Sequence, residues 1–133
     1  MRTSPRTISL VAVLTCAIAL WLGYLNKARC AGAPFDELGR TIRFEDIKDA
    51  HVCYSDIQQL WLGRGINLHR FPFVDGSIDA AGNLVGSTVE YPVLSGLLMW
   101  LGAIGVHTDA DFLLRSALLL APFGLLTAWL LAR

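Results

Sequence analysis

Apolar residues in this chain are concentrated in three blocks towards its two ends. The first block, residues 8–25, contains no charged residue and would form about 27 Å of helix at about 1.5 Å per residue, which just reaches across a bilayer. Arg2 and Arg6 precede it, and Trp21 and Tyr24 stand near its far end, where amphipathic rings favour the headgroup region. The pattern predicts a transmembrane helix over residues 8–25.

A cleaved secretory signal is the alternative for this block, with Ala31-Gly32-Ala33 as the cleavage triplet. Signal cores usually run to about 7 to 15 apolar residues, and Pro34 directly after the triplet is a poor cleavage context. We therefore favour the membrane-spanning helix.

Two further apolar blocks cover residues 91–106 and 112–132. Pro92 suits the first turn of a helix, Pro122 predicts a kink, and Arg115 can extend its charged group to the membrane interface. Because only a short polar connection separates the two blocks, we expect a helical hairpin.

The resulting prediction is an all-α, multi-pass integral protein of the cell membrane. It has a tail over residues 1–7, three transmembrane helices over residues 8–25, 91–106 and 112–132, and a long extracytoplasmic loop over residues 26–90. The composition agrees, since 54% of residues are hydrophobic and 17% are charged. Eleven basic and eleven acidic residues balance, and the absence of a basic stripe with interleaved aromatics argues against nucleic-acid binding.

The long loop carries an amphipathic segment. Apolar residues recur at three- and four-residue spacing between Ile47 and Trp61, which builds one apolar helical face. That face could lie on the membrane or against another helix, and Gly63 is the expected end of the helix.

Asp56 stands where this short helix should begin. Ser55 directly before it and Gln58 three residues after Ser55 have the spacing of a capping box. The sequence therefore predicts a carboxylate fixed at a helix start near the bilayer.

Charge does not determine the side of the membrane on which the loop lies. Arg2 and Arg6 precede the first span, and four basic residues follow it closely, so the count does not place the amino terminus in the cytoplasm. Cys30 and Cys53 both lie in the loop. A disulfide outside the cytoplasm and two free cysteines are both compatible with this spacing.

Three motifs follow one another along the chain: Cys53-Tyr54-Ser55-Asp56-Ile57, then Arg64-Gly65, then Val89-Glu90-Tyr91-Pro92-Val93-Leu94-Ser95-Gly96 with Met99-Trp100-Leu101. In this order, after a first helix and within a long loop, they resemble the amino-terminal part of bacterial membrane glycosyltransferases of the GT-C superfamily. The nearest branch is glycosyltransferase family 87, whose members use polyprenyl-phosphate mannose. The resemblance covers most of the chain.

The resemblance implies a catalytic role for Asp56. In that superfamily an aspartate of the first extracytoplasmic loop acts as general base on the acceptor hydroxyl, while a lipid phosphate leaves the anomeric carbon of the sugar. Asp56 is the position that matches. From the residues alone, an aspartate that solvates a helix start is the alternative.

Four further residues are candidates for substrate binding: Glu90, Arg64, Arg70 and Tyr91. Glu90 and Tyr91 stand at the mouth of the second apolar block, where a carboxylate could accept a hydrogen bond from a sugar. The two arginines could meet a lipid phosphate, since guanidinium matches phosphate geometry. A plain interfacial carboxylate is the alternative for Glu90, and simple solvation of the surface is the alternative for the two arginines.

The chain differs from the family in having only three predicted spans, whereas such enzymes have many more. We therefore expect a truncated or split gene product that needs a second polypeptide to act. A small, non-catalytic membrane interaction protein is the alternative. No cofactor or metal is expected, because the histidines and cysteines lack a ligand spacing.

Overall fold

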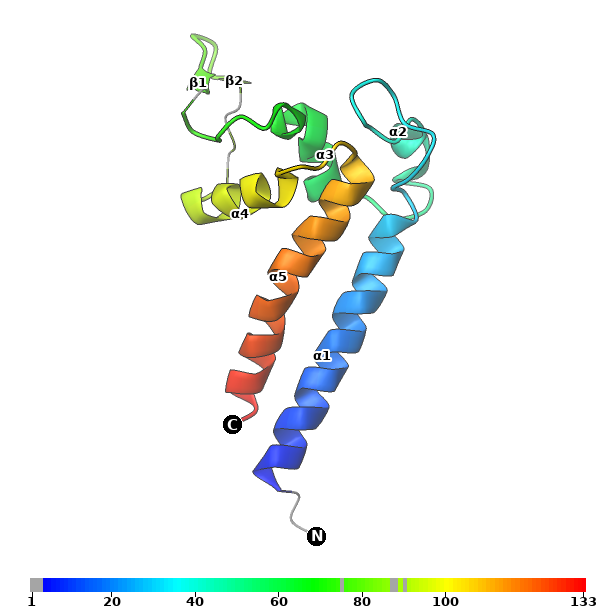
Figure 1. The fold of residues 1–133 in the computed structure, drawn as a ribbon, viewed down its shortest axis with the longest axis vertical. Helices are drawn as coiled ribbons and strands as arrows, with labels where there is room; N and C mark the ends of the chain where they lie inside the picture. The colour runs from blue at the N-terminus through cyan, green and yellow to red at the C-terminus, as the bar shows by residue number, and fades with distance from the viewer. Residues whose placement is uncertain (1–3, 75, 87–88, 90) are drawn as a thin grey trace.

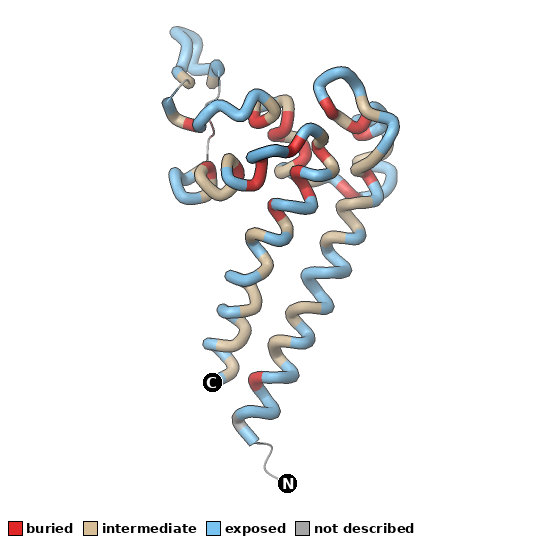
Figure 2. Tube along the Cα trace, viewed as in Figure 1, coloured by how far each residue is buried: buried red, intermediate tan, exposed pale blue. Residues whose placement is uncertain are grey.

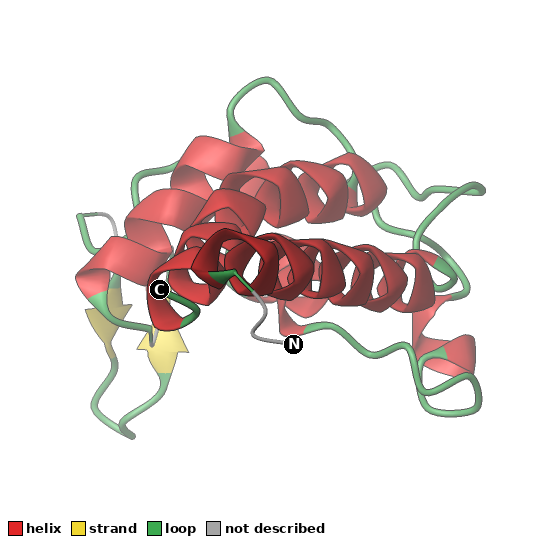
Figure 3. Cartoon of the chain, turned by 90° about the horizontal axis from the view of Figure 1, so that it is seen from below, coloured by secondary structure: helices red, strands yellow, loops and turns green. Residues whose placement is uncertain are grey.

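The computed structural model describes residues 4–74, 76–86, 89 and 91–133, which form helices and one small hairpin (Figure 1). In chain order the elements are α1 (Pro5–Ala28), α2 (Phe44–Ile47), α3 (Asp56–Gly63), the 3-10 helix η1 (Ile66–Leu68), β1 (Ser77–Ile78), β2 (Leu84–Val85), α4 (Val93–Ala103) and α5 (Asp109–Leu131). We call the part between α1 and α5, residues 29–108, the head. Seen from the end opposite the head, the antiparallel β1–β2 hairpin and α2 lie on opposite sides (Figure 3).

Helices α1 and α5 run antiparallel, so both termini lie at the end away from the head (Figure 1). The Ser9 hydroxyl donates to the Ala132 carbonyl oxygen at 3.0 Å, and the Cys16 thiol approaches the Gly124 carbonyl oxygen at 3.7 Å. Within the described residues, the stretches Arg6–Ala28 and Asp109–Leu131, each of 23 residues, are long and apolar enough to cross a membrane. The first stretch contains the first predicted span, the second covers the third predicted span except for its last residue, and few residues of either helix are buried (Figure 2).

The second predicted span, over residues 91–106, is not confirmed. Helix α4 has only 11 residues, or about 16 Å of helix, against a hydrocarbon core of about 30 Å. It lies crosswise to α5 (Figure 1), so the expected hairpin of two long helices is replaced by a corner. Pro92 is the N-cap of α4, and Gly105 adopts a left-handed backbone with φ +69° just after its end.

The hydrophobic core lies in the head, where α3, η1, α4 and the first turns of α5 meet (Figure 2). Its buried residues are Leu60, Trp61, Ile66, Val89, Met99, Ala103, Val106 and Phe112. The Trp61 and Phe112 rings lie 5.5 Å apart between centroids, and the Trp61 indole donates to the Leu38 carbonyl oxygen at 3.0 Å. The apolar face predicted for the loop helix therefore packs against protein.

The long amphipathic segment predicted between Ile47 and Trp61 is divided into two helices. Helix α2 ends at Ile47, Val52 has a left-handed φ of +52°, and α3 begins at Asp56.

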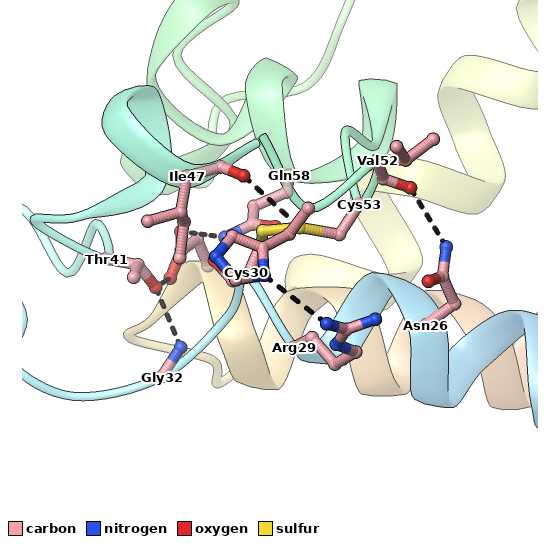
Figure 4. Close-up of a disulfide and its surroundings, with 11 residues drawn as sticks. Asn26, Arg29, Cys30, Gly32, Thr41, Ile47, Val52, Cys53 and Gln58 are labelled. Carbon is pink, nitrogen blue, oxygen red and sulfur yellow. Dashed lines mark hydrogen bonds between the residues drawn. A yellow bond between two sulfur atoms is a disulfide. The ribbon is translucent and has the colours of Figure 1, made fainter. Parts of the chain in front are cut away.

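A disulfide joins Cys30, just after α1, to Cys53, in the connection between α2 and α3 (Figure 4). The two Cα atoms lie 5.9 Å apart, inside the normal range for such a bond.

A buried polar network joins the head to both long helices. Asp109, the first residue of α5, is fully buried and accepts hydrogen bonds from the Thr41 hydroxyl at 2.8 Å and the Gln58 amide at 2.7 Å. The same amide nitrogen donates to the Cys30 carbonyl oxygen at 2.9 Å, just after α1. Because an ionised carboxylate is favoured at a helix N-terminus, Asp109 suits this place.

The predicted capping box is wrong in its hydrogen bonds. Ser55 is the N-cap of α3, yet its side chain makes no capping bond, and the Gln58 side chain points into the buried network. A side-chain cap forms instead at α5, where the Thr108 hydroxyl accepts from the Asp111 backbone N–H at 3.1 Å.

Candidate functional site

The Asp56 carboxylate is held by two tyrosines that come from separate segments of the head. The Tyr54 hydroxyl donates to Asp56 Oδ1 at 2.5 Å, and the Tyr91 hydroxyl donates to Asp56 Oδ2 at 3.1 Å. Asp56 is the first residue of α3, and Ser55 before it is extended with φ −138° and ψ 124°. The carboxylate is exposed, so the two bonds fix its orientation while a ligand can still reach it.

The two hydroxyls remain hydrogen-bond donors at neutral pH. The hydrogen bond to Asp56, followed by desolvation and the carboxylate charge, raises the pKa of Tyr54 to about 12. The same hydrogen bond, again the largest cause, raises the pKa of Tyr91. Since an ionised carboxylate offers about four lone-pair positions, acceptor capacity remains for a further hydroxyl.

A pocket of about 330 Å³ opens at this carboxylate. Its lining residues are Tyr54, Asp56, Gln59, Leu60, Gly63, Arg64 and Tyr91. This volume is at the lower end of small-molecule sites, so the pocket suits one small polar group.

Arg64 brings positive charge to the same pocket. It is the C-cap of α3, its guanidinium donates to the Gly63 carbonyl oxygen at 3.1 Å, and its charge acts to lower the pKa of Tyr91. Gly65 follows with a left-handed φ of +64°, which ends α3 at this point. The pocket therefore combines a carboxylate that can accept a proton and a guanidinium that can bind an anion.

Three of the predicted site residues meet in this pocket, namely Asp56, Arg64 and Tyr91. Arg70 is exposed beyond η1 and does not line the pocket. Glu90 lies outside the described residues. Tyr54 and Gln59 were not predicted; the two-residue spacing of Tyr54 and Asp56 is the one local signal for Tyr54.

Apolar surface adjoins the polar pocket on the side of the long helices. Tyr91 also lines a cavity of about 250 Å³ between α4 and α5, and Ile57, the residue after Asp56, lines that cavity too. Ile57 further lines an apolar groove of about 570 Å³ between α1 and α5. The carboxylate thus stands where the polar head meets the apolar surface of the long helices.

Within the described part of the chain, no three His, Cys, Asp or Glu side chains are grouped as a metal site requires. Comparison of the chain with protein-family models, with curated proteins and with solved structures finds no match.

Proposed function

We propose that this chain provides the acceptor-activating site of a membrane glycosyltransferase that transfers a sugar, mannose by the resemblance, from a polyprenyl-phosphate donor. The observation that carries the proposal is the Asp56 carboxylate, oriented by two phenols and open to a pocket that Arg64 also lines. A carboxylate that only solvated a helix start would need neither tyrosine.

In the proposed reaction the acceptor hydroxyl donates a hydrogen bond to Asp56. The hydroxyl oxygen attacks the anomeric carbon, its proton passes to the carboxylate, and the bond between that carbon and the phosphate oxygen breaks with its electron pair on the oxygen. Polyprenyl phosphate leaves, and Arg64 compensates the charge that develops on it. Orientation of the acceptor hydroxyl by the fixed carboxylate contributes much of the rate.

We propose that the head faces the extracytoplasmic side. The Cys30–Cys53 disulfide supports this, because disulfides persist in oxidising compartments. Arg6 and Arg133 lie near one another at the opposite end, both lining one pocket. Basic residues at that end agree with a cytoplasmic location.

The test is transfer of labelled mannose from polyprenyl-phosphate mannose in membranes of source cells that lack the chromosomal copy and carry a plasmid-borne one. Removal of a general base costs about 10²- to 10⁴-fold in rate, so we expect Asp56→Asn to lose activity on that scale. Asp49→Asn is the matched control, because Asp49 is another exposed aspartate of the head outside the pocket.

Equal amounts of each variant in the membrane, measured by immunoblot, exclude loss of the protein as the cause. Transfer at the wild-type rate with Asp56→Asn would overturn the catalytic assignment. A wild-type chain that adds no transfer at all would favour the non-catalytic interaction protein.

A further inference from the structure

One face of helix α4 packs against the rest of the head. Gly96 lies under the Phe73 ring so closely that a Cβ there would be 2.6 Å from two ring atoms. Met99 and Ala103, three and seven residues further along, are buried in the core. These three positions share one side of the helix, so the opposite side must point away from the rest of the head.

The outward side of α4 is entirely aliphatic. Val93, Leu94, Leu101 and Ile104 are 67%, 69%, 41% and 47% exposed. No charged residue occurs between residues 91 and 106. A helix facing water carries polar residues on its outer side, and a contiguous apolar surface of this kind is covered by a partner or by lipid.

The place of α4 favours lipid as the partner. It lies at the head end of α5 and crosswise to it (Figure 1), and its own length is too short for a span. Apolar residues of the two helices also meet in the corner between them, where Leu98 of α4 and Leu119 and Leu120 of α5 line one cavity. The lipid that would surround α5 would therefore also contact α4.

Polar groups at both edges of α4 fit a membrane interface. The Trp100 indole donates to the His69 carbonyl oxygen at 3.3 Å, which directs its polar edge to the head. The Arg115 guanidinium donates to the carbonyl oxygen of Ile104, the C-cap of α4, at 2.8 Å. Tryptophan and arginine are typical of the headgroup boundary of membrane proteins.

We infer that α4 lies in the plane of the membrane, in the outer boundary between headgroups and acyl chains, with its outward side in contact with lipid. This rests on the membrane placement of α1 and α5 within the proposed function, and not on the chemistry at Asp56. Tyr91 precedes the start of α4 by two residues and donates to Asp56. The depth of α4 in the membrane therefore determines the depth of the Asp56 carboxylate. The carboxylate comes to lie at the headgroup level, where a lipid-linked phosphate would lie.

The test is the depth of spin labels on single added cysteines, in full-length protein reconstituted into palmitoyl-oleoyl-phosphatidylcholine vesicles, with Cys16→Ala and the disulfide intact. Leu94→Cys and Leu101→Cys report the outward side of α4. Leu118→Cys on α5 and Val74→Cys on the head are the matched controls, since all four residues are exposed. Oxygen and a water-soluble nickel chelate are the relaxing agents.

We expect both α4 labels to relax with oxygen, to be protected from nickel, and to lie at one shallow depth above the Leu118 label. Nickel access equal to that at Val74 would overturn the inference, as would protection from both agents, which means a protein cover. Depths that differ by about 10 Å, seven residues at about 1.5 Å each, would mean a spanning helix and would also overturn it. Nickel access at Leu118 would instead contradict the membrane placement of α5, whereas the transfer rate tests Asp56 separately.

Discussion

Replacement of Asp56 by asparagine should change the ionisation of Tyr54 in a way that requires no knowledge of the reaction. Loss of the Tyr54 proton breaks a hydrogen bond of 2.5 Å and places a phenolate beside a carboxylate, which is why the pKa of Tyr54 is raised from 10.0 to about 12. Asparagine keeps an acceptor oxygen and removes the charge. We expect the pKa of Tyr54 to fall back towards 10.0 in Asp56→Asn.

The change is large enough to measure at one pH. At pH 11 a phenol with a pKa of about 12 is roughly 10% ionised, whereas one with a pKa near 10 is roughly 90% ionised. Tyrosine labelled with ¹³C at Cζ reports this directly by NMR in detergent micelles between about pH 9 and 12.5. With three tyrosines in the chain, Tyr24→Phe and Tyr91→Phe variants assign the signals.

Asp49→Asn is the control and should leave the Tyr54 titration unchanged. A Tyr54 signal that titrates near pH 10 in the wild type, or one that Asp56→Asn does not shift, would refute the hydrogen-bonded arrangement. The sign for stability follows from the same shift. Since the folded-state pKa of Tyr54 is raised, its contribution is fully present below about pH 10 and is lost as the pH rises towards 12; it is small, because Tyr54 is substantially exposed.

Three further predictions concern the stability of the head, measured by thermal unfolding followed through tryptophan fluorescence. Gly39→Ala should cost about 2 kcal/mol or more, because φ is +75° and a Cβ would lie 1.9 Å from a backbone carbonyl oxygen. The control Gly82→Ala, with φ +85° and open space around the Cβ, should cost about 1 kcal/mol. Equal losses of stability in the two variants would contradict the close approach at Gly39. Replacement of Cys30 and Cys53 together by alanine should cost about 3 kcal/mol, as loop closure over a separation of 23 residues implies, and an unchanged unfolding temperature would count against the bridge. Trp61→Ala should cost about 3 to 5 kcal/mol because its side chain is fully buried, and a loss below about 1 kcal/mol would mean that the core is packed differently.

The two long helices could be predicted from the sequence, because residues 8–25 and 112–132 are apolar over a length that fits a bilayer. The first of these ranges lies within α1, and the second overlaps α5 except for its last residue. Residues 91–106 gave the same signal and a different structure. An apolar run specifies that a segment leaves water, but it does not specify whether the segment crosses the membrane, lies along it or packs on a neighbour. In the structure, Pro92 and Gly105 limit α4 to a shorter helix.

The carboxylate site was partly predictable for a similar reason. The place of Asp56 at a helix start follows from its immediate neighbours, and Gly63 correctly marks the end of α3. The role of Gln58 does not, because its partner Asp109 is 51 residues away. Local spacing favours a capping bond, whereas the folded chain offers a buried carboxylate as an acceptor. The pairing of Cys30 with Cys53 depends equally on a distance that the sequence does not specify.

The buried network explains how a short helix can hold Asp56 at a fixed place. Gln58 lies two residues after Asp56, and its amide binds both the Cys30 carbonyl, next to α1, and the Asp109 carboxylate, which begins α5. Helix α3 is thereby connected at one point to both long helices. The bonds are buried, where an unsatisfied group would cost about 1 to 3 kcal/mol, so α3 resists sliding relative to either helix. The Asp56 carboxylate, one half-turn before Gln58, is therefore held at a fixed place, and the two tyrosines orient it.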